Sequence, residues 1–331
     1  MKLISKFRIS AIIFLGLISC FLANSPLALA VPAQNGESRL VELQYKTTIP
    51  ADQVTPHNDF SVWIPMAKSR TGQTIVKRSI EVSNDISYSI QDETKYGNKM
   101  IYLKFNEELS EDVVIDITYQ VEINPSIHEE DALSNPADTK YLTPSRLMIV
   151  DDVVKEIARD LTEGLEGTEA KARAIFDYVF KTVQYDKDAP GWGQGDTQRV
   201  CLVGKGNCTD FHSLFISLAR AANIPSRFMI GFQIPESSGG KIKGYHCWAQ
   251  FNANGQWKTV DISEAWKNPA KKDFFFGGFD VNKFTLTSGR DINLDPQQAT
   301  DALNIFFYPY AEASKDDVNI ETSFSFKDLT I

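Results

Sequence analysis

The chain has 331 residues, with 43 Asp and Glu against 34 Lys and Arg, and its formal net charge is −9. This acidic balance argues against nucleic acid as the main partner, because polyanions attract basic proteins. Beyond residue 30, no apolar stretch is long enough to span a bilayer.

The first thirty residues have the pattern of a secretory signal peptide. Cations at positions 2, 6 and 8 precede an apolar run over 11–22, and Ala28-Leu29-Ala30 forms a small-x-small cleavage site. Cleavage there makes Val31 the N-terminus, and the loss of three positive charges changes the net charge from −9 to about −12. The sequence therefore predicts an exported protein, either periplasmic or secreted.

A lipid anchor is the open alternative for this N-terminus. Leu17-Ile18-Ser19-Cys20 loosely resembles a lipobox, which would place a lipid on Cys20. The apolar run continues past Cys20, and this favours cleavage after Ala30.

Residues 31–124 are predicted to form an all-β sandwich domain. Short alternating apolar runs, separated by Pro, Asn and Gly, occur at 40–46, 60–64, 86–90, 101–105 and 114–121. Pro65 is expected to end the second run. This block shows no cluster of chemically reactive residues, and a polar linker that contains prolines is predicted over 125–147.

Residues 148–331 are expected to form the second domain. Helices are predicted over 151–161, with two aspartates at the favourable N-terminal end, and after a cap at Thr168. Residues 186–200 are rich in Gly, Pro and Asp and are predicted to be a loop. Two strands should follow the Cys208 helix, near 227–234 and from 243 onward, with a turn over 235–240 between them.

Cys208 is the candidate nucleophile. It opens an amphipathic helix, in which apolar residues from Phe211 to Ala222 form a buried stripe, and Gly204 and Gly206 let the chain turn into this helix. Unpaired backbone N–H groups at a helix N-terminus favour the thiolate and can help to bind an oxyanion.

His246 and Asp261 are predicted to meet across a hairpin. If residues 252–255 form a four-residue loop, Phe251 faces Gln256 and His246 faces Asp261 on the same side. A carboxylate in that place would orient the imidazole and leave its other nitrogen for Cys208. A slip of one residue would destroy this pairing.

The neighbouring cysteines and His212 have more ordinary interpretations. Cys247 should point away from His246 into the core, and His212 is expected to serve packing or structural hydrogen bonding. After signal cleavage three cysteines remain, which leaves a Cys201–Cys247 disulfide open. A zinc site built from Cys208, His212, His246 and Cys247 is disfavoured, because adjacent residues on a strand point apart.

Aromatic residues near the candidate site have two open interpretations. Trp192 is a candidate for a pocket wall or for oxyanion support, and the alternative is a packing aromatic. Trp266 and the phenylalanines at 274–276 either line a cleft or close the core.

Two segments carry a family resemblance. GKGNCTDFHSLFISLARAANIPSRFMIGF, followed by GYHCWAQFNANGQWKTVDISEAW, resembles the transglutaminase-like superfamily of cysteine enzymes. The shared pattern is a Gly-rich approach to Cys, LARAxxIPxR, His-x-Trp and Trp-x-x-Val-Asp, and it covers about 140 to 270. The resemblance implies catalytic roles for Cys208, His246 and Asp261. It also implies an α+β, papain-like domain, whose nucleophile helix packs on an antiparallel sheet, preceded by the sandwich.

The predicted function is therefore an exported cysteine hydrolase that cleaves peptide or amide bonds through an acyl-enzyme, with protein, peptide or cell-wall peptide as substrate. A transglutaminase, which passes the acyl group to an amine, is one alternative. A non-catalytic binding or scaffolding module is the other. The sequence implies no cofactor and no metal.

Overall fold

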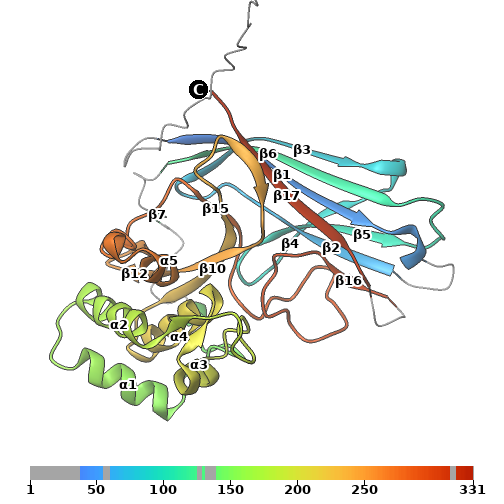
Figure 1. Ribbon diagram of the computed structural model, residues 1–331. Helices are drawn as coiled ribbons and strands as arrows, with labels where there is room; N and C mark the ends of the chain where they lie inside the picture. The colour runs from blue at the N-terminus through green and yellow to red at the C-terminus, as the bar shows by residue number, and fades with distance from the viewer. Residues whose placement is uncertain (1–37, 55–59, 125–128, 131–138, 314–317, 331) are drawn as a thin grey trace, which may run out of the picture. The chain divides into compact units, whose positions relative to one another are not determined.

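The computed structural model describes residues 38–54, 60–124, 129–130, 139–313 and 318–330 (Figure 1). The predicted signal peptide over 1–30, the alternative anchor at Cys20 and most of the predicted linker lie outside these residues. Residues from Pro32 to Ile331 form one unit, which is described below.

Two antiparallel sheets form the sandwich. One has the order β11-β17-β1-β6-β3 and the other has the order β16-β2-β5-β4. Every second residue of β1 and β6 is buried, as the sequence predicted. The bounds are β1 (Arg39–Ile49), β2 (Phe60–Met66), β3 (Gln73–Val82), β4 (Ser89–Asp92), β5 (Lys99–Phe105), β6 (Val113–Ile123), β11 (Gly239–Ile242), β16 (Tyr310–Glu312) and β17 (Glu321–Asp328).

Several strand predictions were wrong in detail. β2 continues through Pro65 to Met66, because β16 pairs only with residues 61–63 and Pro65 needs no partner on that side. β3 was not predicted, and β11 lies in the predicted 235–240 turn region and just beyond it. Strands β11, β16 and β17 come from the second half of the chain. The domain boundaries at 31–124, 125–147 and 148–331 therefore stay a prediction, although the sandwich itself is present.

A third sheet, called the central sheet below, carries the predicted hairpin. Its order is β14-β13-β12-β10-β15, with β7 paired to β13, and the pairings within it are antiparallel. The bounds are β7 (Glu129–Glu130), β10 (Ser226–Gln233), β12 (His246–Ala253), β13 (Gln256–Val260), β14 (Phe276–Gly277) and β15 (Lys283–Ser288). A short parallel pair, β8 (Gln184–Tyr185) and β9 (Lys205–Gly206), precedes the helix that carries Cys208.

Helices gather around one side of the central sheet (Figure 1). Their bounds are α1 (Asp152–Thr162), α2 (Thr168–Thr182), α3 (Thr197–Val203), α4 (Cys208–Ala221) and α5 (Ile262–Lys267). Helix α4 packs on β12 and β10, and the rings of Phe215 and Phe251 lie 6.3 Å apart across this contact. The predicted α+β fold, with the Cys208 helix packed on an antiparallel sheet, is confirmed.

The helix starts match the sequence only in part. Asp151 caps α1 by accepting a hydrogen bond from Val154 N, whereas the sequence placed it inside the predicted helix over 151–161. Thr168 is the first residue of α2 rather than its cap, which is Gly167. Helix α3 lies partly inside the predicted 186–200 loop, because Asp196 caps it and Gly204 ends it in the left-handed conformation.

The other face of the central sheet packs on the sandwich. Phe232 of β10 lies 4.8 Å from Phe324 of β17, and Phe284 of β15 lies 5.6 Å from Tyr119 of β6, between ring centroids. Gln73 also exchanges two hydrogen bonds with the backbone of Thr285. The central strands are therefore covered on both faces. None of the helices in the described ranges is long and apolar enough to cross a bilayer.

Candidate active site

A capping box fixes Cys208 as the first residue of α4. The Asn207 side chain accepts from Thr209 N at 2.9 Å, and the Asp210 carboxylate accepts from Asn207 N at 2.9 Å. Cys208 is 3% exposed. Its backbone N–H is one of the first four of the helix, which have no partner within the helix itself.

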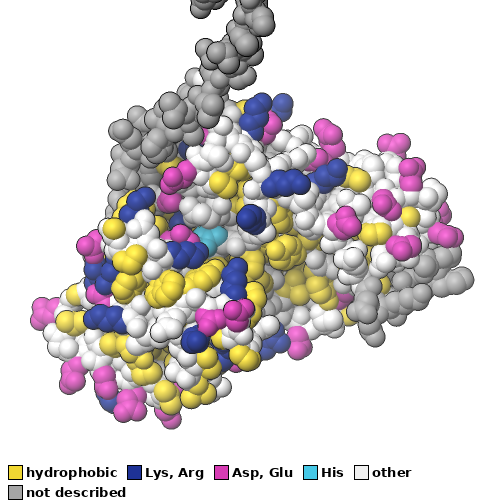
Figure 2. Space-filling view, viewed as in Figure 1, with side chains coloured by type: hydrophobic (Ala, Val, Ile, Leu, Met, Phe, Trp, Pro, Cys, Tyr) yellow, Lys and Arg dark blue, Asp and Glu magenta, His cyan; other side chains and the backbone are white. Residues whose placement is uncertain are grey.

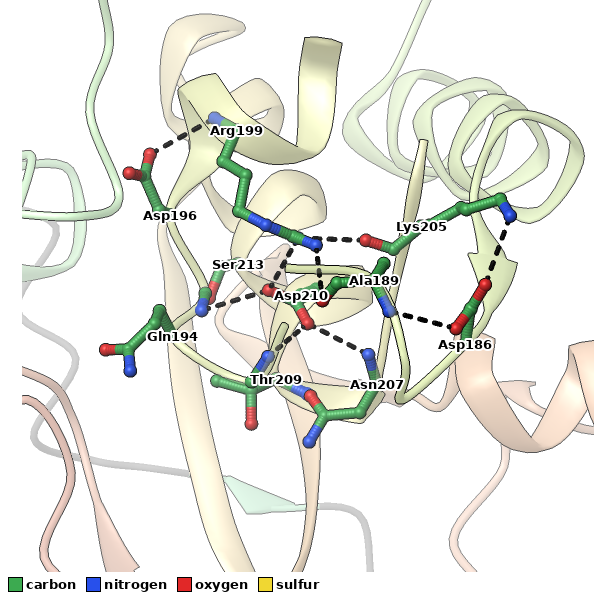
Figure 3. Close-up of polar contacts among 12 residues, drawn as sticks. Asp186, Ala189, Gln194, Asp196, Arg199, Lys205, Asn207, Thr209, Asp210 and Ser213 are labelled. Carbon is green, nitrogen blue, oxygen red and sulfur yellow. Dashed lines mark hydrogen bonds and ion pairs between the residues drawn. The ribbon is translucent and has the colours of Figure 1, made fainter. Parts of the chain in front are cut away.

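Asp210 also ties the preceding loop to this helix start (Figure 3). Its buried carboxylate accepts from Gly193 N at 2.7 Å and from Gly195 N at 3.1 Å, and Arg199 Nη1 lies 3.7 Å away. Gly206 leaves room for this carboxylate, because a Cβ there would lie 2.2 Å from Asp210 Oδ2. Sequence reasoning missed Asp210, although the Asn-x-x-Asp spacing resembles a capping box.

His246 and Asp261 form a buried pair. His246 Nε2 lies 2.7 Å from Asp261 Oδ2, and the two side chains are 7% and 1% exposed. Asp261 also caps α5, because its Oδ1 accepts from Glu264 N at 3.0 Å and from Ser263 Oγ at 3.1 Å. Because Nε2 contacts Asp261, the ring nitrogen of His246 that remains available is Nδ1. The His246 side chain also hydrogen-bonds with the Cys208 thiol. The structure thus brings the three predicted residues together.

The predicted hairpin register was wrong by two residues. Ala253 pairs with Gln256, so the loop contains only Asn254 and Gly255, with φ of 55° and 83°. Positive φ at both loop residues is the geometry that favours Asn-Gly in two-residue hairpins. A slip of two residues keeps every side chain on its own face, because the side-chain period of a strand is two. His246 and Asp261 therefore still meet, although diagonally and beyond the end of the β12–β13 ladder.

Charges in the site favour a thiolate beside an imidazolium. A hydrogen bond from Cys247 and the contact with His246 lower the pKa of Cys208 well below that of an ordinary thiol, although burial opposes this. Burial alone would lower the pKa of His246, but Asp261 and Cys208 raise it to about 9. Burial likewise opposes ionisation of Asp261, but Lys283 and His246 hold its pKa well below the usual range.

Cys247 is a buried core residue, as predicted, but sequence reasoning missed that it also lies at the site. It is buried as expected, but it hydrogen-bonds with Cys208, and its Sγ lies 3.7 Å from Thr209 Oγ1 and 3.9 Å from His212 Nδ1. The three cysteines in the described ranges are free, so the Cys201–Cys247 disulfide is not formed.

His212 makes the structural hydrogen bond that the sequence favoured. Its Nε2 accepts from Ile262 N at 3.0 Å and lies 3.6 Å from Asp261 Oδ1. Burial lowers its pKa to about 4, so it is neutral at physiological pH. The residues that the structure describes contain no group of three or more His, Cys, Asp or Glu that could hold a metal ion.

Lys283 is a buried cation that sequence reasoning missed. Its Nζ lies 2.8 Å from Asp261 Oδ2, and the side chain is 1% exposed. The only sequence signal is a lysine at the start of the run KFTLTS, whose six residues are all buried in β15. A lone lysine at the start of a strand ordinarily indicates a solvated position.

Comparison with known families identifies the central part of the chain. Residues 155–262 match the family model described as the transglutaminase-like superfamily. This segment is a transglutaminase-like domain. The match includes Cys208, His246 and Asp261 and confirms the resemblance to this superfamily.

Relatives match this chain over most of its length. An uncharacterized protein of Haemophilus influenzae is 26% identical over 339 residues, which cover 87% of this chain and 90% of that protein. A structure described as a candidate cysteine protease from Cytophaga hutchinsonii has a TM-score of 0.58 at 16% identity, over 88% of this chain and 98% of its own. At that identity the likeness shows the fold alone. The periplasmic domain of TgpA from Pseudomonas aeruginosa gives a TM-score of 0.38 at 14% identity, over 70% and 96% of the two chains.

Partly exposed aromatic and basic side chains lie on the segments that precede α4 and follow Asp261. Trp192 and Trp266 are 38% and 36% exposed, Trp266 stacks on Tyr185 at 6.4 Å, and Lys267 Nζ lies 4.4 Å from the Tyr185 ring. Figure 2 shows a histidine surface in a hollow between hydrophobic and basic side chains. Phe276 instead packs in the core against Phe251.

Proposed function

We propose that this protein is an exported cysteine peptidase or amidase in which Cys208 is the nucleophile, His246 the acid and base, and Asp261 the residue that orients His246. The contact series Asp261–His246–Cys208 at the start of α4 supports this most strongly. The match of residues 155–262 to a superfamily of cysteine enzymes supports the same assignment.

Each residue has a step in the covalent route. The Cys208 thiolate attacks the carbonyl carbon and forms a C–S bond, and His246 protonates the leaving amine as the C–N bond breaks. His246 then takes a proton from water, the resulting hydroxide attacks the thioester, and the acid leaves as the thiolate is restored. Asp261 holds Nε2 of His246 in a hydrogen bond, so that Nδ1 is the atom that donates and accepts the transferred proton.

The start of α4 would also stabilise the developing oxyanion. The backbone N–H of Cys208 points out of the first helical turn, where the helix dipole favours negative charge. Trp192 lies one residue before Gly193, whose N–H is fixed by Asp210, and is a candidate wall of the substrate pocket.

Hydrolysis and acyl transfer begin with the same acyl-enzyme, so only their products distinguish the two reactions. Purified protein cleaved after Ala30 would be incubated with an unfolded protein substrate and a labelled primary amine, with Cys208→Ala as control. New amino termini that depend on Cys208 support the peptidase, whereas incorporation of the amine without cleavage supports a transglutaminase. Neither product, over a panel of protein and cell-wall peptides, favours a non-catalytic module.

Export is part of the proposal and has its own test. The signal-like pattern over 1–30 predicts a processed protein that begins at Val31 outside the cytoplasm. Amino-terminal sequencing of the protein from fractionated cells should give Val31, whereas a lipidated Cys20 would support the anchor and an uncut Met1 would contradict export.

A further inference from the structure

A buried lysine shares the carboxylate that holds His246. Lys283 Nζ lies 2.8 Å from Asp261 Oδ2, and the same oxygen lies 2.7 Å from His246 Nε2. One carboxylate oxygen is therefore placed between an ammonium and an imidazole. The mechanism above gives this ammonium no role.

The surroundings of Lys283 make Asp261 its main counter-charge. Its Nζ also donates to Gln233 Oε1 at 3.1 Å, and the rings of Trp248 and Phe275 lie 5.8 and 5.5 Å away. Gln233 in turn donates to Asp280 Oδ2 at 3.0 Å. A buried ammonium is costly unless it is paired, so Asp261 and Lys283 hold each other in place.

The position of this cation affects how tightly His246 holds its proton. An unshared carboxylate would attract the imidazolium strongly, because Coulomb interactions are large in a buried site. An imidazolium that is stabilised too far is a poor acid toward a leaving amine. A second cation on the same oxygen weakens that attraction without removing the carboxylate.

We propose that Lys283 is a positioning residue, which aims the Asp261 carboxylate and offsets part of its charge so that His246 can release its proton. This inference rests on the proposed function, because it assumes that His246 acts on a leaving group. Lys283 acts through Asp261 and does not touch the substrate.

Several titratable groups interact with Lys283, Asp261 and Cys208 and contribute to the pH dependence of Cys208 labelling. Asp280 and Glu264 act on Lys283, while His212 and His246 act on Asp261. The groups that interact electrostatically with Cys208 are Cys247, His246, His212, Tyr185, Tyr245 and Lys267. A change confined to Lys283 must therefore be compared with a change at a lysine outside this set.

The rate at which iodoacetate alkylates Cys208 in the full-length mature protein tests the proposal without a substrate. The thiolate forms a C–S bond and iodide leaves, so the rate rises as Cys208 ionises. The anionic reagent is attracted to the imidazolium, so the rate falls again when His246 loses its proton. The upper limb of the pH profile therefore reports His246 and is expected near 9 in the wild type.

Lys283→Met should raise the upper limb by about one pH unit, because removal of a nearby positive charge stabilises the imidazolium. Lys283→Arg keeps the charge and should leave the limb near the wild-type position. If Lys283 only supports packing, its loss would misplace Asp261 and lower the limb. An unmoved or lowered limb in Lys283→Met would overturn the proposal.

Two further variants keep this test decisive. Lys283→Gln keeps a donor for Asp261 without the charge, and it replaces Lys283→Met if that variant does not fold. Lys272→Met is the matched control. Lys272 Nζ lies 2.5 Å from Asp177 Oδ1, and this ion pair is outside the site, so the variant should leave both limbs of the pH profile unchanged. If wild-type Cys208 reacts only as an ordinary thiol, the proposed function fails and this inference fails with it. If the wild type shows both limbs of the expected pH profile but the Lys283 variants leave the upper limb in place, only the inference is overturned.

Discussion

The sandwich and the central sheet bury their strands differently. In β1 and β6 buried and partly exposed residues alternate, whereas every residue of β15 and all but the last of β10 are buried. The central sheet has α4 on one face and the sandwich on the other. Buried polar side chains such as Arg227, His246, Gln250, Thr259 and Lys283 lie on its strands. The sandwich thus supports a sheet in which charged groups are shielded from water and interact strongly.

Asp261→Asn should give the largest effect, because it disturbs stability and chemistry together. The variant keeps an oxygen that can cap α5 but leaves the Lys283 ammonium buried without its counter-charge. Breaking one side of a buried ion pair costs about 3–5 kcal/mol. Urea denaturation should show this loss, and labelling of Cys208 by iodoacetamide at neutral pH should slow. Unchanged stability would mean that Lys283 has another partner.

Leu43→Ala should affect stability alone. Leu43 is fully buried in β1, and the loss of such a side chain costs about 2–5 kcal/mol. Since the site is built on the central sheet, the folded variant should label Cys208 at the wild-type rate. A slower rate in folded protein would show that the sandwich core also sets the geometry of the site.

Gly206→Ala should weaken the start of α4. Its Cβ would lie 2.2 Å from Asp210 Oδ2, so the carboxylate must leave the backbone N–H groups that it caps, at a cost of about 3 kcal/mol. Gly164→Ala is the matched control, because its Cβ would meet nothing within 4 Å and only the positive φ of 72° costs about 1 kcal/mol. Equal losses in thermal melts of the two variants would contradict the role given to Asp210.

Cys247→Ala should have the smallest effect, confined to the acidity of the nucleophile. It removes a hydrogen-bond donor to the Cys208 thiolate, and such a bond corresponds to about one pH unit. The midpoint of Cys208 labelling should therefore move to higher pH by about that amount, while Cys247→Ser, which keeps a donor, should move it less. A shift to lower pH in Cys247→Ala would contradict this account.

The sequence was most informative where one residue pattern determined local structure. Alternation located β1, β5 and β6, and the helical pattern that begins with two aspartates located α1. His246 and Asp261 were predicted to be neighbours despite a wrong register, because an error of two residues leaves the faces unchanged.

The sequence was least informative where long-range packing decides the outcome. Lys283 is 22 positions after Asp261 and meets it only because β15 joins the central sheet at β10. Cys247 follows the alternation expected of a core residue, and only the approach of α4 brings it to Cys208. Helix α3 was hidden by the Gly and Pro residues of the loop before it.

The pH dependence of iodoacetamide labelling tests the central claim most directly. Wild-type protein and a Cys208→Ala control would be treated with iodoacetamide over roughly pH 4 to 9, a range that separates an activated thiol from an ordinary one. The alkylated cysteines would then be mapped by mass spectrometry. A Cys208 thiolate paired with His246 predicts rapid labelling of Cys208 below about pH 7. Labelling that begins only near an ordinary thiol pKa of about 8.5 would contradict the proposed nucleophile.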